Sequence, residues 1–391
     1  MAEGFGLSPE EHIINILKAQ HIDYVATLPC DKVKGLLSLI RDNFSEIPLT
    51  READGLGICA GLALAGRRPM MVIQNTGLGN SVTDIISLFQ AYQISLPILV
   101  SWRGVYSEPI DVQKNFGSKI PNMLESLGIR YTIVEQSEEL GRVKLAIEDS
   151  YQFERVHVIL ISPRLWEGSS LSVGLEDIRS GQLQYERGGF VFPEIKRDAI
   201  NGKLTRCEAI RLVMECVEEQ IVICNLGISS RELFHVKDRS SNFYMLGSMG
   251  LATSIGTGLS MGQNRDVFVI DGDGSLLMNP NSLLSLRMFG RQNLTVFAID
   301  NSAAGSTGGQ ITPTLNYFDL ELLARSLGIT NSYKINDYQG CRDAVSSDVG
   351  TGPKFIHFVT RPGNEEVPVI PMSPVQIKDR FLSSMNHDMR K

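Results

Sequence analysis

Apolar residues recur along this chain in two spacings, and each spacing predicts one kind of secondary structure. Across residues 11–20 they fall three or four positions apart, which is the spacing of a helix with one buried face. The short apolar run at residues 24–28 is stopped by Pro29, as in a buried strand. Because strand and helix patterns alternate along the chain, we expect parallel sheets with helices on both faces.

The second half of the chain repeats this order of elements. Residues 207–219 have the pattern of a helix, and residues 221–224 have that of a buried strand. The stretches 55–77 and 250–274 both describe a small-residue helix, a buried strand and a glycine turn, with their first glycines 195 residues apart. We interpret this repeated pattern as the result of a duplicated domain. Two unrelated units of similar composition are the alternative interpretation.

The periodic pattern is lost between the two halves, where Gly, Ser and charged residues are frequent. We therefore predict a linker at residues 168–203, between a first domain at residues 1–167 and a second at residues 204–391. Both domains are expected to be doubly wound α/β units, and ligands of such sheets bind at the carboxyl ends of the strands.

Composition narrows the function classes. The chain has 391 residues, 43% of them hydrophobic, with a formal net charge of −7, so nucleic acid is not the expected partner. No window of 18 uncharged apolar residues occurs, so no membrane span is predicted. The amino terminus does not resemble a secretory signal, and the six scattered cysteines fit a reducing cytoplasm.

The apolar strand pattern at residues 267–271 leads directly into a turn with ligand-binding chemistry, made of Gly272, Asp273, Gly274 and Ser275. Glycines let the backbone approach a phosphate closely, and a helix that starts here offers unpaired N–H groups. The Asp273 carboxylate is a hard oxygen ligand that suits Mg²⁺. Taken alone, such a turn is only a weak indication of a binding site.

A second polar pair follows one complete strand–helix–strand repeat later. Residues 281–288 have a helical pattern, residues 294–299 form a buried strand, and Asp300 and Asn301 end that strand. Because neighbouring parallel strands end at the same edge of a sheet, we expect Asn301 to lie beside Asp273. The pair predicts a site for Mg²⁺ and a diphosphate.

Together these two segments resemble the signature of the thiamine diphosphate-dependent decarboxylase family. The resemblance implies two similar domains of the thiamine diphosphate-binding fold, with thiamine diphosphate and Mg²⁺ as cofactors. It also implies that Asp273, Asn301 and the backbone carbonyl of Ala303 hold the metal. The usual first Asn of the pair is Asp300 here, so an exchange of roles between Asp300 and Asn301 stays open.

The resemblance extends to two other turns of the second half. In one, Gly247 would accept a hydrogen bond from the cofactor's 4′-amine through its carbonyl. Ser248 follows, and Met249 would wedge between the two cofactor rings. Core packing is the alternative interpretation of Met249. In the other turn, Gly227 and Ser229 would contact the diphosphate.

The catalytic carboxylate is expected from the first half. Glu52 stands where the family places the acid that contacts the pyrimidine ring and promotes proton transfer within the cofactor. Capping of the following helix or pairing with Arg51 is the alternative. Because the family splits its site between the pyrimidine domain of one subunit and the diphosphate domain of another, we expect a homodimer or a larger homo-oligomer with shared sites.

Short members without a middle domain point to the substrate class. Sulfopyruvate and phosphonopyruvate decarboxylases have this layout. Residues 28–30 and 51–61 resemble one subunit of the sulfopyruvate enzymes, and residues 243–250 resemble the other, as in a fused form. The expected reaction converts 3-sulfopyruvate to sulfoacetaldehyde and CO₂, in coenzyme M biosynthesis. Phosphonopyruvate, or another 2-oxo acid in a decarboxylase or carboligase, is the alternative.

A small anionic 2-oxo acid needs cations and hydrogen-bond donors. Arg103 is the first candidate for the sulfonate, because a guanidinium matches an oxyanion, and Lys32 is a weaker one. Gln74 and Asn75, at the end of a predicted strand, are expected to bond the substrate carboxylate or keto oxygen.

Two other classes of protein compete with this interpretation. An NAD-linked oxidoreductase is disfavoured, because no GxGxxG motif follows a strand with an acidic residue about 20 positions later. A catalytically silent protein that binds thiamine diphosphate remains an alternative.

Overall fold

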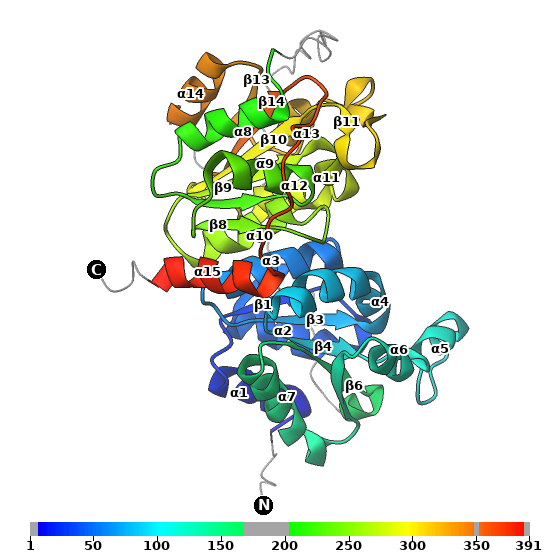
Figure 1. Ribbon diagram of the computed structural model, residues 1–391. Coiled ribbons are helices and arrows are strands. Elements are labelled where there is room, and N and C mark those ends of the chain that lie inside the picture. The colour runs from blue at the N-terminus through cyan, green and yellow to red at the C-terminus, as the bar shows by residue number, and fades with distance from the viewer. Residues whose placement is uncertain (1–6, 168–202, 348–351, 387–391) are drawn as a thin grey trace, which may run out of the picture.

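The computed structural model describes residues 7–167, 203–347 and 352–386, which form two lobes (Figure 1). The first lobe is residues 7–167, and the second lobe is the remainder. Most of the predicted linker 168–203 lies outside the described residues. Each lobe has a six-stranded parallel sheet with helices around it.

The first lobe contributes one sheet. Its strands are β1 Tyr24–Thr27, β2 Ser45–Pro48, β3 Pro69–Gln74, β4 Leu96–Ser101, β5 Arg130–Val134 and β6 Val156–Ile161. Its α-helices are α1 Pro9–Ala19, α2 Lys34–Asn43, α3 Glu52–Leu64, α4 Asn75–Asp84, α5 Asp111–Gly117, α6 Ile120–Ser126 and α7 Gly141–Gln152.

The second lobe contributes the other large sheet and a small hairpin. Its strands are β7 Ile221–Cys224, β8 Asn242–Tyr244, β9 Val267–Gly272, β10 Leu294–Asp300, β11 Ala303–Ala304, β12 Gln310–Ile311, β13 Ser332–Ile335 and β14 Lys354–Val359. Its α-helices are α8 Arg206–Glu215, α9 Ile228–Lys237, α10 Ala252–Gly262, α11 Asp273–Met278, α12 Asn281–Phe289, α13 Leu320–Ser326, α14 Tyr338–Ser346 and α15 Pro374–Asn386.

The two sheets have the same topology. The first runs β2-β1-β3-β4-β6-β5, and the second runs β8-β7-β9-β10-β14-β13, so corresponding strands occupy corresponding places. The predicted fold class, two similar doubly wound domains without a middle domain, is confirmed. The predicted strand 221–224 is β7, and the predicted helix 11–20 is α1, which begins two residues earlier because Ser8 caps it.

The lobes meet along two helices of small residues, α3 and α10 (Figure 1). A Cβ on Gly57 would meet Ser254, a Cβ on Gly61 would meet the backbone of α10, and a Cβ on Gly262 would meet Ala65. The contacts advance together along both helices, so the helices run parallel and begin at the same end. Glycine allows their backbones to approach this closely.

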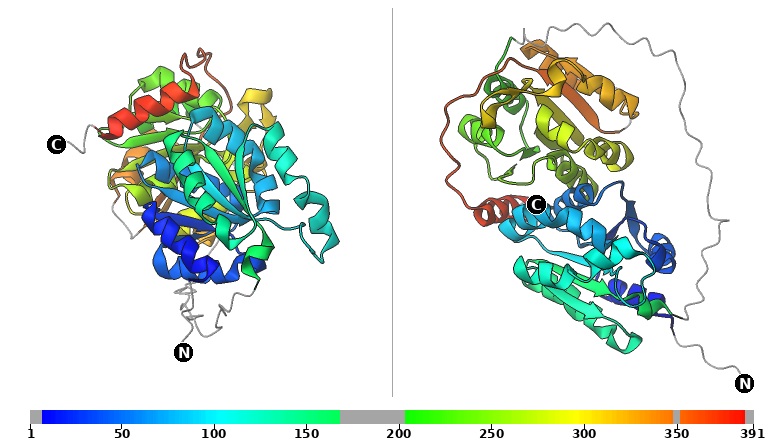
Figure 2. Two further views of the ribbon diagram at one scale, coloured as in Figure 1. Left: turned by 90° about the horizontal axis from the view of Figure 1, so that it is seen from below. Right: turned by 90° about the vertical axis from the view of Figure 1, so that its right-hand side faces the viewer.

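Polar bonds between the lobes accompany this packing. Asp54 of α3 is fully buried and accepts hydrogen bonds from the hydroxyls of Ser254 and Ser285. Burial raises the pKa of Asp54, although these hydroxyls oppose the rise. In α15, the Lys378 amine crosses to the first lobe and pairs with Glu154 at 2.6 Å (Figure 2 shows α15 beside that lobe).

The helix contact predicts a large effect of a very small substitution. In Gly61→Ala, the new Cβ would overlap the Ile255 carbonyl oxygen and lie 2.7 Å from the Leu259 nitrogen. We expect the free energy of unfolding in urea to fall by about 1–3 kcal/mol, because backbone atoms must separate. Gly141→Ala, where a Cβ meets open space, is the matched control. Equal stability of the two variants would contradict the close approach.

Among the described residues, no helix combines the length and apolar character needed to cross a bilayer.

Candidate active site

The predicted metal ligands gather at the carboxyl edge of the second sheet. Strands β9 and β10 pair in parallel with Ile299 opposite Gly272, so the residues that follow both strands emerge side by side. The turn after β9 begins α11 with Asp273, and the turn after β10 contains Asn301. The structure therefore brings Asp273 and Asn301 to one place, as the spacing of the motifs predicts.

Asp273 is held by two threonines that sequence reasoning missed. It is only 4% exposed, and its Oδ2 accepts hydrogen bonds from the hydroxyls of Thr312 and, at 3.3 Å, Thr314. Burial, followed by the negative charge of Asp300, raises the pKa of Asp273 to about 6. An acid that is costly to ionise in this environment is a group that a bound cation would stabilise in its charged form.

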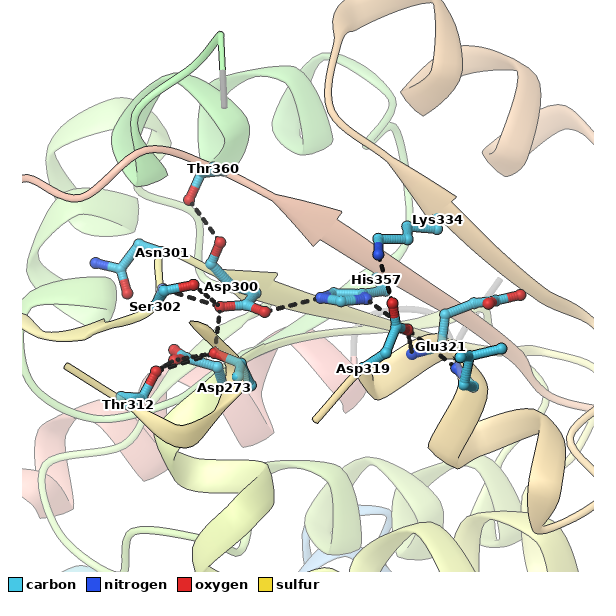
Figure 3. Close-up of polar contacts among 12 residues, drawn as sticks. Asp273, Asp300, Asn301, Ser302, Thr312, Asp319, Glu321, Lys334, His357 and Thr360 are labelled. Atoms are coloured by element: carbon cyan, nitrogen blue, oxygen red, sulfur yellow. Dashed lines mark hydrogen bonds and ion pairs between the residues drawn. The ribbon is translucent and has the colours of Figure 1, made fainter. Parts of the chain in front are cut away.

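Both carboxylate oxygens of Asp300 are engaged by neighbouring residues (Figure 3). Its Oδ1 accepts hydrogen bonds from the Ser302 amide at 2.9 Å and the Thr314 hydroxyl at 2.8 Å, and its Oδ2 lies 2.9 Å from His357 Nε2. Although burial alone would raise the pKa of Asp300, the His357 contact holds it below its ordinary value. With both oxygens engaged, this geometry favours Asn301 over Asp300 as the ligand.

His357 of β14 stands between two acids (Figure 3). Opposite Asp300, its Nδ1 lies 3.5 Å from Asp319 Oδ1, and Asp319 also pairs with Lys334. Burial would lower the pKa of His357, but the two carboxylates outweigh burial and raise it. The contacts with His357 and with the Ser302 amide hold Asp300 behind the turn that carries Asn301.

Asn301 has an open hydrogen-bonding position. Its Oδ1 accepts only a long bond of 3.4 Å from the Ala303 amide, and its Nδ2 is buried without a partner among the described residues. Ser302, the residue between Asn301 and Ala303, has φ +52°. Few residues other than glycine adopt this conformation, so the chain turns sharply here. An unpaired buried amide is costly. This donor set of carboxylate, amide oxygen and backbone carbonyl fits Mg²⁺.

The glycine turns leave room for a diphosphate. Gly227 has φ +82°, and a Cβ there would meet nothing within 4 Å. It precedes α9, whose first turn carries Ser229. At Gly272, an added Cβ would meet only Asn225 Nδ2, at 3.5 Å. The Ser275 hydroxyl already has a protein partner, because it accepts a 3.1 Å hydrogen bond from the Gly250 amide.

The Gly247–Met249 turn lies between the lobes. Ser248 has φ +59°, and its hydroxyl is 2.7 Å from that of Ser87 in the first lobe. A Cβ on Gly247 would also meet Ser87. Met249 is 40% exposed, which argues against ordinary core packing, and its Cε lies 3.4 Å from the place of a Cβ on Gly274.

Glu52 is the first residue of α3. Because α3 and α10 run parallel, it lies at the end of the helix pair where α10 also begins. It is 6% exposed, and within the described ranges its carboxylate forms no hydrogen bond or ion pair, neither with Arg51 nor as a cap of α3. Its side chain lies against the Gly77 backbone, where a Cβ would overlap it. A buried carboxylate without a partner is expected to bind a group that is not part of the chain.

Comparison with known proteins identifies the family to which this chain belongs. Residues 9–125 match the family model "Thiamine pyrophosphate enzyme, N-terminal TPP binding domain", and residues 225–358 match the C-terminal TPP binding domain. Sulfopyruvate decarboxylase from Methanosarcina acetivorans is 42% identical to this chain, over 97% of this chain and 98% of its own length. The chain belongs to the sulfopyruvate decarboxylase family. It is therefore an enzyme of the thiamine diphosphate-dependent decarboxylase class.

The chain is also similar to two other proteins. A phosphonopyruvate decarboxylase from Streptomyces viridochromogenes is 29% identical over 91% of this chain and 90% of its own. An X-ray structure described as a thiamin diphosphate-dependent enzyme from Mycobacterium smegmatis aligns with a TM-score of 0.68, covering 92% of this chain and 100% of that one. At 12% identity, the latter shows a shared fold.

Among the residues predicted to bind the substrate, Arg103 is engaged by carboxylates of the protein itself. Its guanidinium forms a bidentate ion pair with Glu108, at 2.6 and 2.9 Å, and a third bond of 2.7 Å to Asp31. The Glu108 bond outweighs burial and raises the pKa of Arg103, while it lowers that of Glu108 to about 2. These contacts hold the loop after β4, and a cation paired with two carboxylates has less of its charge left for an anionic substrate.

The other predicted substrate residues differ in whether their side chains are already engaged by the protein. The Asn75 amide is engaged in a mutual pair of hydrogen bonds with the Arg103 backbone, at 2.9 and 3.2 Å. Gln74 is half-buried at the carboxyl end of β3, and its side chain has no hydrogen-bond partner in the described parts of the chain. Lys32 lies after β1 at the same edge, 3.8 Å from Asp31. Gln74 and Lys32 therefore stay candidates.

Several residues around the site could not be found from motifs. Thr312 and Thr314 follow a short hairpin, and no periodic signal ties them to Asp273. Asp319 caps the start of α13 and His357 lies in β14, and only the fold brings them behind Asp300. A buried polar residue in an apolar strand, such as His357, was the one available signal, because it requires a polar partner.

The raised pKa of Asp273 predicts how cofactor binding depends on pH. In the metal-free protein, ionising this acid is unfavourable, so its contribution to stability falls as pH rises from about 4 to about 6. Bound Mg²⁺ needs the charged form, so proton release accompanies binding at low pH. We expect the rise in melting temperature caused by Mg²⁺ and thiamine diphosphate to be small at pH 5 and larger at pH 7.5. A shift that decreases over this range would contradict the assignment.

Proposed function

We propose that this chain decarboxylates 3-sulfopyruvate to sulfoacetaldehyde and CO₂, with thiamine diphosphate and Mg²⁺ as its cofactors, in coenzyme M biosynthesis. The observation that supports this function most strongly is the 42% identity to the Methanosarcina acetivorans sulfopyruvate decarboxylase over 97% of the chain. The meeting of Asp273 and Asn301 at one sheet edge supports the cofactor assignment independently.

The residues that would hold the cofactors come from three turns of the second lobe. We propose Asp273, Asn301 and the Ala303 carbonyl for Mg²⁺. The diphosphate would then lie against the backbone of Gly227 and Ser229 and of the turn that contains Gly272, Gly274 and Ser275. Gly247, Ser248 and Met249 would contact the organic rings. When bound, thiamine diphosphate supplies the carbanion that adds to the 2-oxo carbonyl and the electron sink for decarboxylation.

Glu52 is the proposed catalytic residue. Its buried carboxylate, supported by the Gly77 backbone, would hold a proton against the pyrimidine nitrogen. Since it has no protein partner in the described residues, the bound ring would satisfy it. The apolar small-residue surroundings of α3 and α10 would also keep water away from this proton.

The sulfonate needs a cation other than Arg103. Lys32 and Arg51 both lie at the carboxyl edge of the first sheet. Arg51 is exposed and directly precedes Glu52, and its side chain forms no hydrogen bond or ion pair among the described residues. We propose that these two cations, with the amide of Gln74, bind the two anionic ends of the substrate.

Removal of these cations should affect the sulfonate selectively. We expect Arg51→Ala and Lys32→Ala each to raise the KM for sulfopyruvate by about tenfold or more, since a charged hydrogen bond is lost. The KM for pyruvate should change little, because pyruvate lacks the second anion. Arg41→Ala, which removes an exposed arginine of α2, is the control. Equal effects on both substrates would assign the cations to another role.

Substrate choice is tested by CO₂ release from sulfopyruvate, phosphonopyruvate and pyruvate under identical cofactor conditions. We expect the highest kcat/KM for sulfopyruvate. Phosphonopyruvate is the second candidate, because a phosphonopyruvate decarboxylase matches along 91% of the chain at 29% identity. Preference for it would leave the decarboxylase chemistry intact and reject the sulfonate assignment.

Assembly, location and domain limits are also part of the proposal. We propose a homodimer or larger homo-oligomer in the cytoplasm, with a pyrimidine-binding domain at residues 1–167, a linker at 168–203 and a diphosphate-binding domain at 204–391. Free cysteines, five of the six buried, fit a reducing compartment. Light scattering of the purified chain measures the oligomeric state directly.

A further inference from the structure

We propose that the buried ion pair of Arg103 and Glu108 positions the catalytic carboxylate, because it fixes the helix turn against which Glu52 packs. The inference rests on the proposed function for the role of Glu52, and it extends that function to two residues that act through Glu52. Both are positioning residues in this role, since neither has to touch the substrate or the cofactor.

The ion pair is buried, and its geometry is specific. Arg103 and Glu108 are 6% and 5% exposed, and the guanidinium meets both carboxylate oxygens, at 2.6 and 2.9 Å. The same carboxylate accepts longer bonds from the amides of Gly104 and Ile110, at 3.4 and 3.3 Å. Breaking such a pair leaves a buried charge without compensation, which is strongly unfavourable. The pair therefore holds residues 103–110 in one conformation.

The backbone of this loop needs such a constraint. Tyr106 and Ser107 follow one another with φ +47° and +56°, a region that residues other than glycine seldom adopt. Gly104 has φ +86°, and a Cβ there would overlap the Gln113 carbonyl. Unfavourable backbone conformations persist only where the surrounding contacts enforce them. Because the ion pair spans these residues, we expect the loop to relax once the pair is broken.

The loop is bonded to the first turn of α4. The Arg103 amide donates to Asn75 Oδ1 at 2.9 Å, and Asn75 Nδ2 donates to the Arg103 carbonyl at 3.2 Å. Asn75 is the first residue of α4 and is fully buried. Since the residue that bonds Asn75 through its backbone is held by Glu108 through its side chain, a relaxed loop would release the start of α4.

Helix α5 packs against α4 on the same side (Figure 1). A Cβ on Gly79 would overlap the Phe116 ring, and a Cβ on Gly117 would overlap the Arg103 carbonyl. Trp102 Nε1 also donates to the Gly117 carbonyl at 2.8 Å. The loop after β4 and α5 therefore support the first turns of α4 together.

Glu52 packs against that same turn. Gly77 lies two residues after Asn75, and a Cβ on it would overlap the Glu52 carboxylate. Within the described ranges the carboxylate has no hydrogen bond or ion pair that could orient it, so the Gly77 backbone is the contact that limits its position. The contacts form one path from the ion pair to the catalytic carboxylate.

The substitution Glu108→Gln separates positioning from the sulfonate binding first expected of Arg103. The amide keeps the size of the side chain but removes the charge that occupies the guanidinium. If the pair positions Glu52, we expect kcat for sulfopyruvate to fall by about 10–100-fold, the effect of a small misplacement, with little change in KM. If Arg103 binds the sulfonate, the freed guanidinium should lower KM and leave kcat unchanged, which would overturn the proposal.

Two further variants complete this comparison. Arg103→Lys should lower kcat as Glu108→Gln does, because an ammonium cannot form the bidentate pair. Asp111→Asn is the matched control, because it breaks the exposed ion pair with Lys114 at 2.7 Å in the same segment. It should keep the wild-type kcat.

A double variant tests whether the pair acts through Glu52. Residues that act as one unit have effects that do not add. We therefore expect Glu108→Gln to cause no further loss of kcat when Glu52→Gln is already present. A second loss of the same size as in the wild-type background would show that the ion pair acts elsewhere, and would overturn the proposal.

Hydrogen–deuterium exchange followed by mass spectrometry tests the path without any activity. In Glu108→Gln, peptides of α4 should exchange faster than in the wild type, whereas peptides of α7 in the same lobe should not change. Unchanged exchange in α4, or equal acceleration in both helices, would overturn the proposal. If Glu108→Gln does not fold, Asn75→Ala breaks the same path and leaves the ion pair in place. A wild-type enzyme inactive on sulfopyruvate would reject the proposed function, and the exchange measurement would still decide the positioning.

Discussion

Glu52→Gln is expected to abolish most decarboxylation while thiamine diphosphate still binds. The amide keeps the shape of the side chain and its contact with Gly77 but cannot hold the proton. Since general acid–base catalysis contributes about 10²–10⁴-fold, we expect kcat to fall by that factor. Steady-state kinetics measures the rate, and isothermal titration of the cofactor in the presence of Mg²⁺ measures binding.

The matched control is Glu138→Gln, in an exposed turn of the first lobe, which should leave kcat unchanged. Loss of the folded state is excluded when the Glu52 variant melts at the wild-type temperature. Wild-type turnover of the Glu52→Gln variant would show that this carboxylate has another role. Capping of α3 would then be reconsidered, although the structure shows no such bond.

Asp273→Ala is expected to remove Mg²⁺-dependent binding of thiamine diphosphate. The substitution deletes the one charged group proposed to bind the metal, so we expect affinity to fall by at least about 100-fold and activity to be lost with it. The metal-free variant should be no less stable than the wild type, since a buried acid with a raised pKa is removed. Binding is measured by cofactor titration at several Mg²⁺ concentrations.

Asp266→Asn is the control for this substitution, because Asp266 is an exposed acid just before the opposite end of the same strand, β9. It should bind the cofactor as the wild type does. An Asp273→Ala variant with unchanged Mg²⁺ dependence would place the metal elsewhere. Asp300 would be the first alternative, and its bonds to Thr314 and His357 would then have to rearrange.

The sequence was most informative where chemistry follows directly from the order of elements. The turn after residues 267–271 and the pair at Asp300 and Asn301 come from consecutive strands, so parallel pairing alone brings them together. The duplicated pattern likewise predicted two sheets, whose strands have the same order. These predictions depend on local sequence and on one general rule of sheet geometry.

The surroundings of the predicted substrate residues could not be predicted from the sequence, for a physical reason. Arg103 is conspicuous in the sequence as a cation after a strand, but whether it is free depends on what surrounds it. Glu108, only five residues later in a stretch without periodicity, takes two of its donors, and Asp31 takes a third from another strand end. No sequence pattern predicts which charges cancel.

The contact between the lobes could not be predicted either. The sequence pattern predicted two small-residue helices, now seen as α3 and α10, but nothing in the sequence states what each helix packs against. Only the structure pairs Gly57 with Ser254 and buries Asp54 between the lobes.

The most direct test of the central claim is CO₂ release from sulfopyruvate labelled with ¹³C at its carboxyl carbon. The purified chain is assayed with both cofactors, and again with thiamine diphosphate or Mg²⁺ omitted after chelation. We predict labelled CO₂ and an equal amount of sulfoacetaldehyde only when both cofactors are present. Release that is unchanged without them, or no release with them, would contradict the account.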